Sequence, residues 1–137
     1  MILTKWKKAF LLFTILLLIV IGLVLKLWMV PKPILSDLEN AEILLITMSP
    51  CSPHAISVKD YPEKEILSVL SRHTERNTLS RNINDLYDVD LEIVFAENGT
   101  SHFIYLGSNS YSYSTMSGFR RDIPDGPEIL SELLEYI

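Results

Sequence analysis

The sequence predicts an α+β domain, in which two helices pack on an antiparallel β-sheet (a meander), preceded by one N-terminal transmembrane helix. Three observations lead to this fold class. A long apolar run occupies residues 9–30, two later segments carry apolar residues at helical spacing, and a pair of alternating segments is joined by Asn98-Gly99. The elements are justified below in chain order.

The apolar run at residues 9–30 predicts a membrane span. As a helix it would be about 33 Å long, close to the roughly 30 Å thickness of the hydrocarbon core of a bilayer. Trp6 and Trp28 flank the run as interfacial anchors, and Pro31 and Pro33 end it. Its only charged residue, Lys26, lies one turn from the end and can extend its amine to the interface.

The charges around the span predict its orientation. The short N-terminal side, residues 1–8, carries Lys5, Lys7 and Lys8, whereas acidic residues soon follow on the other side. The positive-inside rule therefore places residues 1–8 in the cytoplasm and the rest of the chain in an extracytoplasmic position at the cell membrane.

A cleaved signal peptide is the main alternative to a permanent anchor. Signal peptides usually have an apolar core of about 7 to 15 residues that ends in small residues. The run here is longer and ends in Leu27-Trp28-Met29-Val30, so an uncleaved signal anchor is favoured. A lipoprotein is excluded, because the single cysteine, Cys51, lies too far beyond the run.

The part of the chain after the span is acidic. From Pro31 onward there are eight Lys and Arg against all seventeen Asp and Glu, a net formal charge of −9. Such a surface does not attract nucleic acid, which binds clustered Lys and Arg. One cysteine permits no internal disulfide. Residues 31–40 are expected to form a stalk, and residues 41–137 an extracytoplasmic α+β domain.

Two helices and a hairpin are predicted in this domain. Residues 43–46 are expected to form a strand buried on both faces, and residues 54–59 a second strand that pairs with it. The helices begin at Asp60-Tyr61-Pro62-Glu63 and Asp125-Gly126-Pro127-Glu128, where each Asp is expected to cap the first turn. The apolar stripes that follow both starts indicate helix faces packed on the core.

The clearest β signal lies between the helices. Residues 89–96 alternate between apolar and polar side chains and end at Asn98-Gly99, the dipeptide typical of a two-residue type I′ turn. This turn predicts that Glu97 faces Thr100 and that the core-facing pairs are Phe95 with His102, Ile93 with Ile104, and Leu91 with Leu106. Further short strands are expected at residues 110–114 and 118–123.

This order of elements resembles small membrane-anchored extracytoplasmic domains of Gram-positive bacteria. The resemblance rests on the anchor, the aromatic-rich hairpin, the Gly118-Phe119-Arg120 strand and the closing helix. It implies a bacterial cell-surface location and carries over no site residues, because those families have no assigned function.

Cys51 and His54 suggest a small thiol-dependent enzyme, since a neighbouring imidazole stabilises a thiolate. The sequence supplies no residue to orient the imidazole, so we expect a free or structural cysteine and no catalysis. A metal site built from Cys51, His54, His73 and His102 lacks closely spaced ligand pairs. Neither a metal nor a cofactor is therefore expected, and His102 is interpreted as a partly buried core residue.

Tyr111 and Tyr113 are the candidate binding residues. They lie on one side of the strand 110–114 and alternate with serines, a pattern that suits the stacking of sugars or the docking of a peptide. The same pattern describes tyrosines that cover a helix, and both interpretations stay open. Arg120 and Arg121 are expected to be a solvated pair.

The leading functional hypothesis is a non-catalytic binding, inhibitory or immunity-like module at the cell surface that contacts a protein, peptide or glycan. Besides the thiol enzyme, the alternative is an accessory subunit of a membrane complex, recognised through the span near Gly22.

Overall fold

The computed structural model describes residues 2–36, 38, 40–78, 89–108, 112–115 and 120–137. Two compact units, residues 1–30 and residues 31–137, are described separately here. The first unit is a single helix, α1 (Ile2–Trp28), whose stretch Thr4–Trp28 is long and apolar enough to cross a membrane. A signal sequence near an N-terminus meets the same criterion of length and composition.

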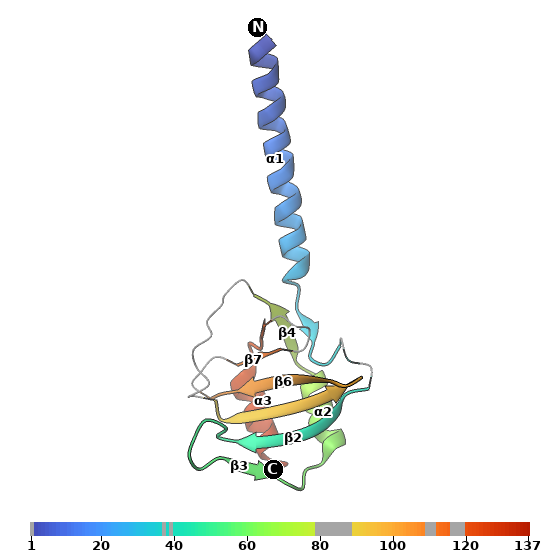
Figure 1. The fold of residues 1–137 in the computed structure, drawn as a ribbon, viewed down its shortest axis with the longest axis vertical. Coiled ribbons are helices and arrows are strands. Elements are labelled where there is room, and N and C mark those ends of the chain that lie inside the picture. The colour runs from blue at the N-terminus through green and yellow to red at the C-terminus, as the bar shows by residue number, and fades with distance from the viewer. Residues whose placement is uncertain (1, 37, 39, 79–88, 109–111, 116–119) are drawn as a thin grey trace. The chain divides into compact units, whose positions relative to one another are not determined.

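The second unit has an α+β fold, as predicted (Figure 1). Its helices are α2 (Glu63–Ser71) and α3 (Gly126–Leu134). The strands are β1 (Lys32–Pro33), β2 (Glu42–Met48), β3 (Ile56–Val58), β4 (Thr74–Asn77), β5 (Leu91–Glu97), β6 (Thr100–Leu106), β7 (Tyr113–Ser114) and β8 (Arg121–Asp122). They form one antiparallel sheet in the order β1-β4-β8-β7-β6-β5-β2-β3. Strands β5 to β8 are neighbours in chain order, whereas β4 and β2 flank them, so only this central part is a meander.

The β5–β6 hairpin has the predicted register. Glu97 pairs with Thr100, Phe95 with His102, Ile93 with Ile104, and Leu91 with Leu106. Asn98 and Gly99 have φ angles of 50° and 79°, the left-handed conformations that a type I′ turn requires. The turn chemistry therefore fixes which side chains of both strands enter the core.

The core lies between the sheet and the two helices, which Figure 1 shows behind the strands. The apolar stripes predicted for the helices supply Ile66, Val69 and Leu70 from α2 and Ile129, Leu130 and Leu133 from α3. The central strands supply the other side of the same cluster: Ile43, Ile46, Leu91, Ile93, Phe95, Ile104 and Leu106.

Strand β2 is buried on one face only, so the prediction of a fully buried strand is wrong. Leu44 is 54% and Leu45 40% exposed, whereas Ile43 and Ile46 are buried. An irregularity between Ile43 and Leu45 explains the pattern, because an extra residue in one strand changes which side chains face the core.

The helices begin where expected, but the capping side chains act differently from the prediction. Neither helix has a side-chain hydrogen bond at its N-cap. Glu63 instead accepts a hydrogen bond at 3.0 Å from the backbone N–H of Ile43, and Tyr61 donates one at 3.2 Å to the carbonyl of the same residue. These two side chains hydrogen-bond the outer edge of β2 at Ile43, whereas β3 pairs with the same edge further along, at residues 46–48.

Part of the segment that was expected to form a stalk belongs to the folded domain. Lys32 and Pro33 pair with Glu75 and Thr74 of β4, and Ile34 is 1% exposed in the core. The backbone N–H of Ile34 donates to the carbonyl of His73 at 3.0 Å. The chain thus enters the domain as a strand at one end of the sheet.

Candidate functional site

The face of the sheet that points away from α2 and α3 carries two adjacent rows of side chains. Since the core side chains of β5 are Leu91, Ile93 and Phe95, alternation places its other side chains on the opposite face. By register, one row consists of Leu45, Val94 and Phe103, and the other of Glu92, Tyr105 and Tyr113. We call these six residues the open face; it lies toward the viewer in Figure 1.

The aromatic rings of the open face form a continuous strip. Phe103 and Tyr105 are stacked at a ring distance of 6.1 Å, and the rings of Tyr105 and Tyr113 lie 4.9 Å apart. The guanidinium carbon of Arg120 lies 3.9 Å from the centre of the Tyr113 ring, in cation–π geometry. Strands β6 and β7 and the residue before β8 therefore build one aromatic surface.

Of the two predicted binding residues, Tyr113 belongs to this surface and Tyr111 lies outside the described residues. Tyr113 is only 9% exposed, so it is largely packed, as one interpretation of the sequence expected. Among the described residues, its ring lies against Tyr105 and Arg120. Tyr105 and Phe103 are half-buried and present the accessible part of the strip.

The electrostatics of the strip disfavour negative charge on its phenols. Burial, together with the nearby Glu92 carboxylate, Tyr113 and Cys51, raises the pKa of Tyr105 to about 12. Burial also raises the pKa of Tyr113, against the opposing effect of Arg120, and burial raises the pKa of Glu92. The phenols are neutral hydrogen-bonding groups at any physiological pH.

Cys51 lies near the tyrosines of the open face and not in a pair with His54. Both Cys51 and His54 are exposed, and the backbone N–H of His54 donates to Ser52 Oγ at 3.0 Å. No hydrogen bond joins the Cys51 thiol to an imidazole among the residues that the structure describes.

The histidines considered for a metal site have different surroundings. His73 is held between two carboxylates, with Nδ1 3.3 Å from Asp125 Oδ2 and Nε2 3.3 Å from Glu132 Oε1. His102 is half-buried opposite Phe95, in agreement with its predicted position. Within the described ranges, no three His, Cys, Asp or Glu side chains are grouped as metal ligands.

A buried ionic cluster, which the sequence did not reveal, lies on the core side of β4, β7 and β8. Arg121 donates from Nη1 to Glu75 at 2.8 Å and from Nε to Asn77 at 3.0 Å, while the Ser114 hydroxyl donates to the other oxygen of Glu75. Glu75 is 1% and Arg121 5% exposed. The prediction of a solvated Arg120-Arg121 pair is therefore wrong for Arg121, and Arg120 covers a tyrosine ring.

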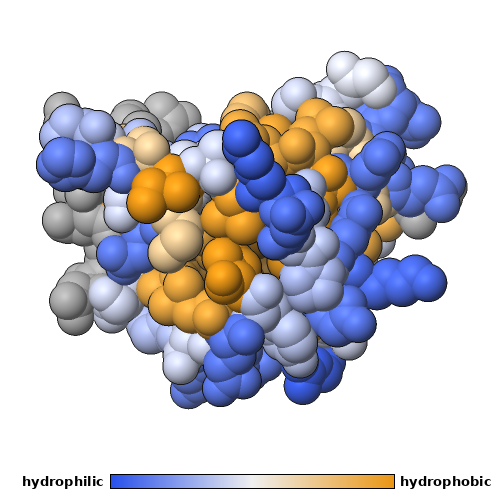
Figure 2. Space-filling model, turned by 90° about the horizontal axis from the view of Figure 1, so that it is seen from below, coloured by the Kyte–Doolittle hydropathy of each residue, from blue (hydrophilic) through white to orange (hydrophobic). Residues whose placement is uncertain are grey.

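Apolar side chains also reach the surface at the end of the domain where β3 and the C-terminus lie. Figure 2 views the domain from that end and shows hydrophobic residues gathered between polar ones. Ile56 on β3 and Leu134 at the end of α3 are among the exposed hydrophobic residues.

Comparisons with protein-family models, with curated proteins and with solved structures find no match to this chain.

Proposed function

We propose that this chain is a single-pass membrane protein whose C-terminal domain is an extracytoplasmic, non-catalytic module that binds a partner protein through the open face. Inhibitory and immunity-like proteins act in this way, by occupying a surface of another protein. Residence on the surface of a Gram-positive bacterium, implied by the resemblance above, is part of the same proposal.

The anchored topology is supported by the length and apolar composition of α1 and by the lysines before it. Thr4–Trp28 exceeds the roughly 20 residues that a helix needs to cross a bilayer. Lys5, Lys7 and Lys8 favour a cytoplasmic N-terminus. The acidic charge of the remaining chain argues for a protein partner rather than nucleic acid.

The observation that carries the binding proposal is the composition of the open face. Tyrosine and arginine are enriched at the energetic centres of protein interfaces, because they bury a large area and keep a polar group for hydrogen bonding. Here the aromatic strip continues through Phe103 into the apolar row, in which Leu45 is 40% exposed. No described helix covers this face, although α2 and α3 cover the other one.

The thiol-enzyme alternative receives no support from the surroundings of Cys51. A catalytic cysteine needs an adjacent base or cation, and among the described residues no hydrogen bond or ion pair joins Cys51 to His54. We propose that Cys51 is a structural or incidental thiol.

Cys51 provides a direct test of the topology, because it is exposed and is the only cysteine in the chain. A maleimide that cannot cross membranes should label Cys51 in intact cells. The matched control replaces Cys51 by Ser and Thr4 by Cys, and should be labelled only after the membrane is permeabilised. The reverse pattern would contradict the proposed orientation, and labelled domain in the medium would show that α1 is cleaved.

The binding surface is tested by placing a photoreactive amino acid at Phe103 of the full chain in its native cell. A discrete adduct is expected, which is lost when Tyr105 is changed to Ala. The matched control places the same probe at Glu128, an exposed residue of α3. Adducts of equal yield at both positions, or an adduct insensitive to Tyr105→Ala, would refute the assignment of the open face.

A further inference from the structure

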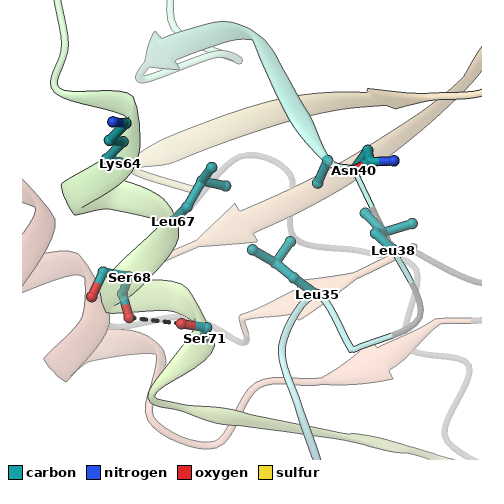
Figure 3. Close-up of a pocket in the computed structure, with 8 residues that line it drawn as sticks. Leu35, Leu38, Asn40, Lys64, Leu67, Ser68 and Ser71 are labelled. Carbon is teal, nitrogen blue, oxygen red and sulfur yellow. Dashed lines mark hydrogen bonds between the residues drawn. The ribbon is translucent and has the colours of Figure 1, made fainter.

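A groove between α2 and the segment that follows β1 opens on a different part of the domain from the open face. Its volume is about 510 Å³, within the roughly 300 to 1,000 Å³ typical of small-molecule sites. Figure 3 shows Leu35 and Leu67 pointing toward one another from its two sides, with Leu38 beyond Leu35. These three side chains and Ala41 are half-buried and pack against the core, so the floor of the groove is apolar.

Polar groups line the rest of the groove. Lys64, Ser68 and Ser71 follow one another on α2, and Asn40 lies across from them. Lys64 is exposed and forms no ion pair with any residue that the structure describes. The Ser71 hydroxyl donates to the carbonyl of Ser68 at 3.0 Å, so the Lys64 ammonium and the Ser68 hydroxyl are the donors beside the apolar floor. These two groups suit an amphiphile that carries a phosphate.

The position of the groove in the chain points to the source of that amphiphile. Leu35 follows Trp28, the last residue of α1, by seven residues, and a segment of that length reaches at most about 25 Å. If α1 spans a bilayer, the groove is tethered within reach of the lipid headgroups of that bilayer. Tethering of this kind raises the effective concentration of the headgroups at the groove.

The charge of the domain restricts the headgroup. A net charge of −9 after the span repels anionic lipids, whereas a zwitterionic headgroup offers its phosphate to Lys64 and its ammonium to the acidic surface.

We propose that this groove binds a zwitterionic glycerophospholipid of the membrane in which the chain is anchored, with the lipid phosphate at Lys64 and its apolar part on Leu35, Leu38 and Leu67. The inference rests on the proposed anchoring and is independent of the protein partner of the open face. Lipid binding would hold the domain at a defined height and orientation on the bilayer.

The test uses the full chain in lipid nanodiscs that contain phosphatidylethanolamine with a photoactivatable diazirine in one acyl chain. Labelled peptides are identified by mass spectrometry. We expect labelling of α1 together with labelling of residues 34–41 and 63–71. Lys64→Glu should lower labelling of the groove peptides by roughly tenfold, because it replaces attraction to the phosphate by repulsion.

Lys59→Glu is the matched control, since it makes the same charge change at an exposed lysine that does not line the groove. Its groove labelling should equal that of the parent. Leu67→Ser supplies a second variant that weakens the apolar floor, and circular dichroism melts check that each variant is folded.

The two proposals fail in different ways. Labelling of α1 without labelling of the groove, or groove labelling that Lys64→Glu leaves unchanged, overturns the lipid site and leaves the anchor intact. A chain that shows no labelling of α1 and is extracted from membranes by alkaline carbonate overturns the anchor and, with it, the lipid site.

Discussion

Removing one partner of the buried Glu75–Arg121 pair should destabilise the domain severely. In Arg121→Met the Glu75 carboxylate, 1% exposed, keeps the Ser114 hydroxyl and loses its cation. Asn77 also loses the donor that bonds its side-chain oxygen. A buried charge left without its partner costs about 3 to 5 kcal/mol, a large part of the roughly 5 to 15 kcal/mol that stabilises a typical domain.

The double variant Glu75→Leu, Arg121→Met distinguishes the stability that the ion pair contributes from the destabilisation caused by one buried charge without a partner. It removes both charges and fills the space with apolar groups of similar size. Such replacements are often neutral or stabilising, so the double variant should recover most of the stability that Arg121→Met loses.

The assay is urea unfolding of residues 31–137, followed by far-UV circular dichroism. This fragment keeps β1 and Ile34, which belong to the folded unit. With a slope of about 1 to 3 kcal/mol per molar urea, Arg121→Met should lower the midpoint by at least about 1 M. A loss below about 1 kcal/mol, or a double variant less stable than Arg121→Met, would refute the buried network as described.

Four further predictions concern the hairpin and the aromatic strip. Gly99→Val should lower the unfolding free energy by about 1 to 3 kcal/mol, because Gly99 has a φ of 79° that a β-branched residue adopts only under strain. Ile104→Ala should lower it by about 2 to 5 kcal/mol by leaving a cavity at a fully buried position. A Gly99→Val domain that unfolds in urea like the parent would show that the turn does not set the register. Tyr113→Ala should also destabilise the domain, by about 3 to 5 kcal/mol, since its ring is packed between Tyr105 and Arg120; urea melts with an unchanged midpoint would mean that this ring acts in binding alone. The pKa of Tyr105 is raised to about 12, against 10.0 for a free tyrosine, so the stability that its neutral phenol contributes is fully present below pH 10 and is lost as the pH rises through 12. The unfolding free energy should therefore fall across this pH range, and it should fall less in Tyr105→Phe. An equal dependence of the unfolding free energy on pH in the two proteins would rule out Tyr105 as the cause.

The hairpin and both helices were predictable because local sequence determines them. A two-residue Asn-Gly turn permits one register, and an apolar stripe can face only the core, so Ile93 and Ile104 were paired correctly. The capping side chains were predicted less well, because Glu63 and Asp125 find partners on other elements, which lie about 20 and 52 positions away in the chain.

The candidate site was predicted only in part, because distant segments build it. Tyr113 stood out through its alternation with serines, but its neighbour Tyr105 lies on another strand and gave no separate signal. The buried Arg121 was missed because arginine is normally exposed, and its partner Glu75 lies 46 positions earlier in the chain. Pro31 and Pro33 suggested a stalk, whereas the burial of Ile34 depends on the position of β4.

The entry of the chain through β1 decides how the domain responds to mechanical load. Any pull transmitted along the chain from α1 reaches the domain first at Lys32–Pro33, a two-residue strand held to β4 and followed by the buried Ile34. Short ladders at the end of a sheet open at lower free energy than the central strands. Detachment of β1 would bare the edge of β4 at Glu75, the register partner of Lys32, while the β5–β6 hairpin stayed folded. Tension would thus expose the unpaired backbone groups of a strand edge that is covered at rest.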